Sequence, residues 1–215
     1  MTTSGLHGIG MTSQRTRARM IERLREKGIR NEAVLRAMAA VPRHVFVEEA
    51  LASRAYEDTA LPLGMGQTIS QPFVVARMIE LLLNGRTTLG KTLEVGAGCG
   101  YQAAVLAQLT SEVYSLERLA PLLEKAKANM RQLKQFNVRL KHADGQFGLP
   151  EAGPFDSIIV AAAGLKVPPA LLEQLADGGR LVIPVGNDRE QQLLRITRRG
   201  DRYEREVLGP VIFVP

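Results

Sequence analysis

Apolar residues recur with two different periods along the chain, and the change falls near residue 90. Before it, apolar residues return every three or four positions, which predicts amphipathic helices. These helices are expected over residues 12–27, 32–40 and 73–83, with a shorter amphipathic piece over 48–55. Gly28 and Pro42 favour chain breaks after the first two, and Asn31 is suited to cap the start of the second.

After residue 90, short apolar runs alternate with helical patterns. Strands are expected over 91–95, 112–116, 138–141, 155–160, 180–185, 192–197 and 203–214, and helices over 101–109, 120–136 and 169–175. A turn at Arg199-Gly200-Asp201 would join the last two strands. This alternation predicts an α/β fold: a doubly wound, mostly parallel, seven-stranded Rossmann-like sheet, preceded by an N-terminal helical segment.

Residues 59–72 fit neither period. They are rich in Gly, Pro, Gln, Ser and Thr, and we expect an irregular loop, a kind of segment that usually carries function inside a compact domain. A length of 215 residues suits one domain over 1–215. We divide it into a flexible tail (1–10), N-terminal helices with a substrate loop (11–90) and a cofactor-binding α/β core (91–215).

Composition narrows the class of protein. Apolar residues at 45% and charged residues at 23% are ordinary for a globular chain and exclude a disordered one. The one cysteine, Cys99, excludes an intrachain disulfide, and His7, His44 and His142 lack metal-ligand spacing, so no metal is expected. We expect Cys99 to fill a small space and His44 to pack or cap, neither acting as a catalyst.

The remaining expectations concern location and partners. No apolar run could cross a bilayer and the first residues lack the apolar region of a signal peptide, so we expect a cytoplasmic protein without a membrane partner. We also expect a monomer. A net charge of +6 admits nucleic acid as a partner. The basic residues between Met11 and Arg30, however, alternate with Ile21 and Leu24 at helical spacing and indicate a solvated face. Aromatic residues at 5% offer few stacking platforms, so nucleic acid is not expected.

A glycine-rich stretch carries the strongest chemical signal. A predicted strand runs directly into Gly96, Gly98 and Gly100, and a helix follows at once. Alternate glycines allow a sharp turn and close approach of a ligand to the backbone, and a helix start offers N–H donors. Read from Gly98, the stretch also satisfies the dinucleotide pattern G-x-G-x-x-A, so a nicotinamide cofactor stays open on this pattern alone.

Acidic residues accompany three successive strands of the predicted sheet. Glu94 lies in the first strand, Glu117 ends the second, and Asp144 with Gly145 follows the third. Because the carboxyl ends of parallel strands share one edge of a sheet, these groups should converge there. Glu117 could accept from a ribose diol and Asp144 from an adenine amino group. We therefore expect a ligand that contains adenosine.

The motifs resemble those of a known family. The stretch 93–101 resembles the first cofactor motif of class I S-adenosylmethionine-dependent methyltransferases. Residues 67–72, with Thr68, Ile69 and Ser70 at the centre, are similar to the signature of protein-L-isoaspartate O-methyltransferases. Segments 42–47, 55–58 and 178–186 match that family in order, and the resemblance covers 11–215. The chain departs from it at Ala97 and Cys99, where the family usually carries hydroxyl residues.

The resemblance implies an enzyme that transfers the methyl group of S-adenosylmethionine to the free α-carboxylate of L-isoaspartyl residues in damaged proteins and peptides, starting their repair through a succinimide. It implies Ser70 as the residue that positions this carboxylate, although a serine here could also cap the following helix. The residues that it implies for cofactor binding are Thr68, Ile69, Ser70, Glu94, Gly96, Ala97, Gly98, Gly100, Glu117, Arg118, Asp144 and Gly145.

Three alternatives use the same type of fold. A nucleic-acid methyltransferase would use the helix over 12–27 as a phosphate surface and bind in a salt-dependent way. It would usually carry a base-reading motif such as Asn-Pro-Pro-Tyr where this chain has residues 161–164. A nicotinamide oxidoreductase would show hydride chemistry, and a regulator would bind S-adenosylmethionine without turnover.

Overall fold

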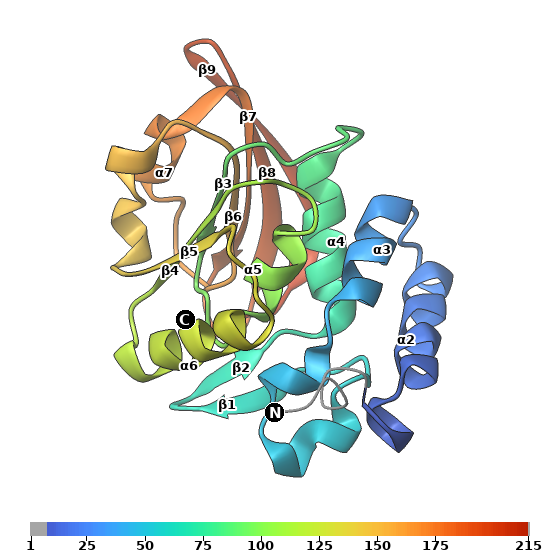
Figure 1. Cartoon of the computed structure of the whole chain (residues 1–215). Coiled ribbons are helices and arrows are strands. Elements are labelled where there is room, and N and C mark those ends of the chain that lie inside the picture. Colours follow the sequence, from blue (N-terminus) through green and yellow to red (C-terminus); the bar gives the residue numbers. More distant parts are fainter. Residues whose placement is uncertain (1–7, 215) are drawn as a thin grey trace.

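The computed structural model describes residues 8–214 as one α/β domain with a helical N-terminal part (Figure 1). Most of the expected tail, residues 1–7, lies outside the described residues, and Gly10–Thr12 form a 3-10 turn, η1. Within residues 8–214, every helix is too short or too polar to cross a membrane.

The N-terminal part has the helices that the apolar period predicted, with small changes at their ends. Asn31 caps the second of them through hydrogen bonds from the backbone N–H groups of Ala33 and Val34. The helical elements are α2 (Gln14–Glu26), α3 (Glu32–Ala40), η2 (Arg43–Phe46), η3 (Glu49–Arg54) and α4 (Pro72–Leu83).

The segment expected as an irregular loop contains a β-hairpin, so that prediction was wrong for most of its length. Strands β1 (Leu61–Gly64) and β2 (Gln67–Ile69) pair antiparallel. Met65 and Gly66 join them with positive φ angles of 53° and 70°, the left-handed conformation that two-residue hairpin turns require. Strands of three or four residues are too short to show a period of two. In addition, Pro62 argues against a strand where the first of them lies.

The central sheet has seven strands in the order β5-β4-β3-β6-β7-β8-β9, and the predicted doubly wound fold is confirmed. The first five strands of this order are parallel, and β8 and β9 return antiparallel, so the last three strands form a meander. The strands are β3 (Thr92–Val95), β4 (Val113–Glu117), β5 (Val138–His142), β6 (Phe155–Val160), β7 (Leu175–Gly186), β8 (Gln191–Arg199) and β9 (Arg202–Val211).

Three helices and two 3-10 turns connect these strands. All three helices end earlier than their patterns predicted, and after the second of them Lys134 adopts a left-handed φ of 53°. The elements are α5 (Tyr101–Leu106), α6 (Ala120–Gln132), η4 (Gly145–Phe147), η5 (Pro150–Ala152) and α7 (Pro169–Glu173).

Apolar side chains alternate between the two faces of the sheet and build two cores. Ile159 and Val182 point to the core shared with α2 to α6, whereas Ile158 and Leu181 point to the core covered by α7. The chain moves from β3 outward to β4 and β5, then crosses back to β6 on the other side of β3. This topological switch point, beside β3 and β6, is where open α/β sheets bind their ligands.

Candidate functional site

The glycine loop after β3 is folded back onto β4 by its own backbone. Gly96 and Ala97 donate their N–H groups to the Leu116 carbonyl at 2.9 and 3.0 Å. The three alternating glycines have φ angles of 90°, 54° and 88°, as their spacing predicted. A Cβ atom at Gly100 would lie 2.8 Å from Met130 Cε, so glycine also lets α6 approach the loop.

Glu117 ends β4 directly beneath this loop. Its side chain is buried, and its two oxygens accept one backbone hydrogen bond each, Oε2 from Gly98 N at 2.8 Å and Oε1 from Leu119 N at 2.9 Å. Each carboxylate oxygen can accept a second hydrogen bond. Glu117 is thus fixed in place and keeps acceptor capacity toward the edge of the sheet, where a ribose was expected.

Glu94 lies behind the loop and reaches the site only through another residue. It is fully buried; Oε1 accepts from Gln102 Nε2 at 3.1 Å and Oε2 accepts from the Ser115 hydroxyl. Burial raises the pKa of Glu94 to about 8, against the opposing effect of the two hydrogen bonds. The structure therefore places Glu94 as the support of Gln102 and not on the cavity wall.

The remaining expected adenosine contacts follow β4 and β5. Asp144 is exposed and accepts from Gln146 N at 3.0 Å, so it also makes the local turn that its position allows. A Cβ atom at Gly145 would lie 2.1 Å from Val95 Cγ1, which makes glycine necessary there. Arg118 is exposed next to Glu117.

Ser70 stands between the hairpin and α4, and it does not cap that helix. Instead Asp58 Oδ1 accepts from Phe73 N at 2.8 Å, and Asp58 Oδ2 accepts from Gln71 Nε2 at 3.0 Å and pairs with Lys27. The half-buried Ser70 hydroxyl has no hydrogen-bond partner within residues 8–214. Its polar capacity is therefore available to a ligand.

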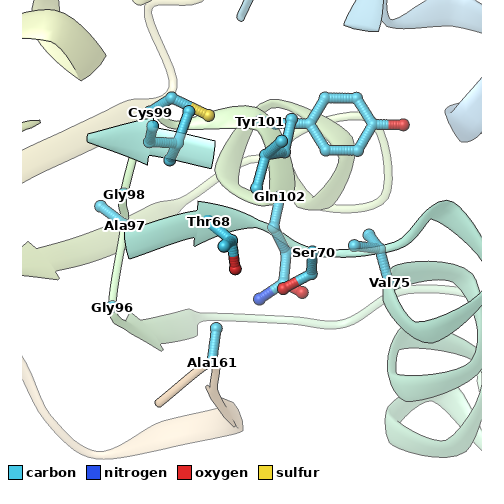
Figure 2. A pocket seen from close by; sticks show the side chains of 12 residues that line it. Thr68, Ser70, Val75, Gly96, Ala97, Gly98, Cys99, Tyr101, Gln102 and Ala161 are labelled. Atoms are coloured by element: carbon cyan, nitrogen blue, oxygen red, sulfur yellow. The ribbon is translucent and has the colours of Figure 1, made fainter. Parts of the chain in front are cut away.

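A cavity lies between the hairpin and the glycine loop, and it encloses about 40 Å³. Figure 2 shows the side chains of Thr68, Ser70 and Gln102 beside the glycine loop, with Ala161 at the end of β6. Its wall is formed by Leu63, Thr68, Ile69, Ser70, Val75, Gly96, Ala97, Gly98, Cys99, Tyr101, Gln102 and Ala161. Six of the expected site residues are therefore brought together: Thr68, Ile69, Ser70, Gly96, Ala97 and Gly98.

Cys99 and His44, which the sequence analysis assigned to packing or capping, lie in different surroundings. Burial raises the pKa of the Cys99 thiol to about 11, so it is neutral and poorly nucleophilic. His44 Nδ1 and the Tyr56 hydroxyl share a hydrogen bond of 2.8 Å within the N-terminal part.

Sequence reasoning missed two residues of this region, Gln102 and Arg43. Arg43 is fully buried; it stacks 4.7 Å from the ring centre of Tyr101 and donates to the Ala55 carbonyl at 2.8 Å. Burial lowers the pKa of its guanidinium group. An arginine directly after Pro42, in a short 3-10 turn, carries no sequence signal for burial, whereas Gln102 could have been found from its place in the first turn after the glycines.

Comparison with known proteins connects this geometry to a family. The sequence profile of the family described as Protein-L-isoaspartate(D-aspartate) O-methyltransferase (PCMT) matches residues 15–215. The chain belongs to this family. It is therefore an enzyme that transfers methyl groups from S-adenosylmethionine to isoaspartyl residues, the first step in repair of the damaged protein. The resemblance stated from the sequence is confirmed.

Relatives of this methyltransferase cover nearly its whole length. The protein-L-isoaspartate O-methyltransferase of Dechloromonas aromatica is 84% identical over 98% of this chain and 97% of its own. That of Methylobacillus flagellatus is 58% identical over 100% of this chain and 97% of its own. A PCMT from Plasmodium falciparum, crystallised with S-adenosyl-L-homocysteine, is 28% identical with a TM-score of 0.81, over 92% of this chain and 96% of that one.

Proposed function

We propose that methyl transfer takes place at the cavity between the hairpin and the glycine loop, where Ser70 holds the isoaspartyl carboxylate. The Ser70 hydroxyl carries this proposal, because it lines the cavity and has no partner among residues 8–214. A hydroxyl donates well to a carboxylate. Asp58 accepts the hydrogen bond from Phe73 N at the start of α4. Ser70 is therefore not needed as the cap of this helix, and its hydroxyl can bind a ligand.

The residues at the sheet edge fit S-adenosylmethionine. Glu117 keeps acceptor capacity for the two ribose hydroxyls, and Asp144 with Gly145 lies one strand further out, where an adenine amino group would meet an acceptor. Gly96 and Gly98 provide close backbone approach for the rest of the molecule. The bound cofactor supplies an electrophilic methyl group on a sulfonium sulfur.

The substrate carboxylate needs no general base, since a free α-carboxyl group is ionised at neutral pH. One carboxylate oxygen forms a bond to the methyl carbon while the carbon–sulfur bond breaks and its electron pair stays on sulfur. Orientation of the two reactants can contribute about 7–11 kcal/mol. Ser70 replaces one of the water molecules that the carboxylate loses on entering the cavity, so desolvation does not cancel this gain.

The test is transfer of a labelled methyl group to a synthetic isoaspartyl peptide, with the aspartyl peptide of the same sequence as the control. Base-labile methylation of the isoaspartyl peptide alone is the expected result. Equal methylation of both peptides, or of neither while the cofactor still binds, would contradict the placement of the substrate carboxylate. In the latter case RNA becomes the next substrate to measure.

We also propose that the enzyme works as a monomer in the cytoplasm, without nucleic acid or membrane partners. The basic residues in and just after α2 support the absence of a nucleic-acid partner, because several are engaged within the chain. Arg25 pairs with Glu22 and Glu32 at 2.7 and 3.0 Å, and Lys27 pairs with Asp58. Light scattering should give the mass of one chain, and a strong salt-dependent affinity for RNA would contradict the proposal.

A further inference from the structure

Gln102 is a second polar group on the cavity wall with unused hydrogen-bonding capacity. It lies in the first turn of α5 and is only 7% exposed. Its Nε2 donates to Glu94 Oε1 at 3.1 Å, and its Oε1 has no partner within residues 8–214. Figure 2 shows the amide end of Gln102 directed to the same part of the cavity as the Ser70 hydroxyl.

Glu94 fixes the orientation of the Gln102 amide on the side away from the cavity. Glu94 is fully buried on β3, and its other oxygen accepts from the Ser115 hydroxyl on β4. Because Glu94 Oε1 accepts from Gln102 Nε2 while Oε2 is engaged with the Ser115 hydroxyl, the amide nitrogen faces Glu94 and the carbonyl oxygen faces the cavity. Only 7% of Gln102 is exposed, and a carbonyl group with little access to water and no donor forgoes much of its hydrogen-bond energy. The cavity is therefore built to receive a hydrogen-bond donor at this point.

The order of the strands indicates which part of the cofactor arrives there. Asp144 follows β5, Glu117 ends β4 and the glycine loop follows β3, and these strands are neighbours in that order. An adenosine held between Asp144 and Glu117 directs the amino-acid end of the cofactor onward to β3. Gln102 and Ser70 line the cavity at that place. The amino-acid end offers one strong donor, its α-ammonium group, since its carboxylate can only accept.

We propose that Gln102 binds the α-ammonium group of S-adenosylmethionine through its carbonyl oxygen, and that Glu94 and Ser115 hold it in the required orientation. This assignment rests on the placement of the cofactor given above. Gln102 is then a cofactor-binding residue, and Glu94 and Ser115 are positioning residues. This assignment also explains why the carboxyl group of Glu94 is buried behind the glycine loop and does not line the cavity.

The experiment is calorimetric titration of the whole protein with two ligands. One is S-adenosylhomocysteine, and the other is the same molecule without its amino group. Gln102→Leu should weaken binding of S-adenosylhomocysteine at least tenfold, about 1.4 kcal/mol, and leave binding of the deamino analogue unchanged. Gln102→Met, which keeps the side-chain length, should give the same pattern. Gln108→Leu is the matched control, because Gln108 bonds to Ala104 O and Gln135 outside the cavity.

The other outcomes are equally informative. Equal weakening of both ligands by Gln102→Leu and Gln102→Met would mean a structural role and overturn the inference, as would unchanged binding of both. If the unmodified protein binds neither ligand, the placement of the cofactor itself is overturned. Ser115→Ala should cause a smaller loss for S-adenosylhomocysteine only, since Glu94 then keeps one of its two donors.

Discussion

The two ends of helix α4 differ in how the polar groups around them are satisfied. At the C-terminal end, arginine side chains satisfy the last carbonyls of the helix; the donors are Arg86, Arg180 and Arg195 and the acceptors are Leu81, Leu82, Leu83 and Asn84. At the N-terminal end, Asp58 accepts from Phe73 N, and the Ser70 hydroxyl just outside the helix has no partner within residues 8–214.

The difference separates stability from function within one element. Cations at a helix C-terminus interact favourably with the helix dipole, and three guanidinium groups there anchor α4 to the sheet. At the N-terminal end Asp58 caps the helix, so the hydroxyl of Ser70 is not used for capping and can bind a ligand. Substitutions at the arginine end should therefore change the free energy of unfolding, and those at Ser70 should change turnover.

Glu117 tests this separation most severely, because one carboxylate both anchors the glycine loop and faces the ligand. Glu117→Ala should weaken cofactor binding by roughly 1.5–3 kcal/mol, since the ribose loses a charged acceptor and Gly98 N loses its partner. Calorimetric titration with S-adenosylhomocysteine measures this. Glu124→Ala, an exposed residue paired with Lys127, is the control, and equal affinity in both variants would remove Glu117 from the binding site.

Substitutions of the arginines at the C-terminal end of α4 should affect stability alone. Arg195 donates to Leu81 O at 3.1 Å and pairs with Glu206 at 2.7 Å, so Arg195→Ala should lower the free energy of unfolding by about 2 kcal/mol. Urea denaturation measures the change. Arg199→Ala on the same strand removes an exposed pair with Glu204 and should cost less than about 1 kcal/mol. A large fall of kcat in Arg195→Ala at saturating substrates would break the separation.

Ser70→Ala should affect turnover alone. We expect kcat to fall at least ~10-fold, about 1.4 kcal/mol of barrier, with the melting temperature and cofactor affinity nearly unchanged. Ser70→Thr keeps a hydroxyl and should recover part of the activity. Ser53→Ala on the exposed surface of η3 is the control. Unchanged turnover in Ser70→Ala would show that the hydroxyl does not hold the carboxylate.

Substitution of Asp58 should have the smallest effect on the free energy of unfolding, and this effect should depend on pH. Burial raises its pKa, but hydrogen bonds from Lys27, Phe73 N and Gln71 outweigh burial and hold the pKa below its usual value. A carboxyl with a lowered folded-state pKa contributes its full stability above its ordinary pKa of about 3.9, and this is lost as the pH falls further.

The Asp58→Asn variant isolates that contribution. Relative to the unmodified protein, it should lose about 1 kcal/mol of stability at neutral pH, and the difference should shrink below about pH 4. Urea titrations at several pH values measure this. Glu57→Gln changes the neighbouring, more exposed carboxyl group, which pairs with Arg54. A difference that grows toward acid pH would contradict the assignment.

The sequence predicted what is encoded locally. Helix α3 and strand β6 have the predicted bounds, and the glycine spacing identified the loop after β3. The hairpin was missed because its strands are too short for a period. The turn predicted at Arg199-Gly200-Asp201 joins β8 to β9. The place of this pair in the sheet was not assigned, because it depends on the order of the parallel strands, whose contacts are distant in sequence. Gln102 was missed for a related reason, since its role depends on Glu94 on another element.

The hairpin also narrows the space beside the glycine loop. Leu63 lies within 3.5 Å of the position that a Cβ atom of Gly98 would take, and the space beneath encloses about 40 Å³, well below the several hundred that ligand sites usually provide. Leu63 therefore limits how much of a ligand can lie beside the glycine loop in this arrangement, and the hairpin sets the shape of the site as directly as the glycines do.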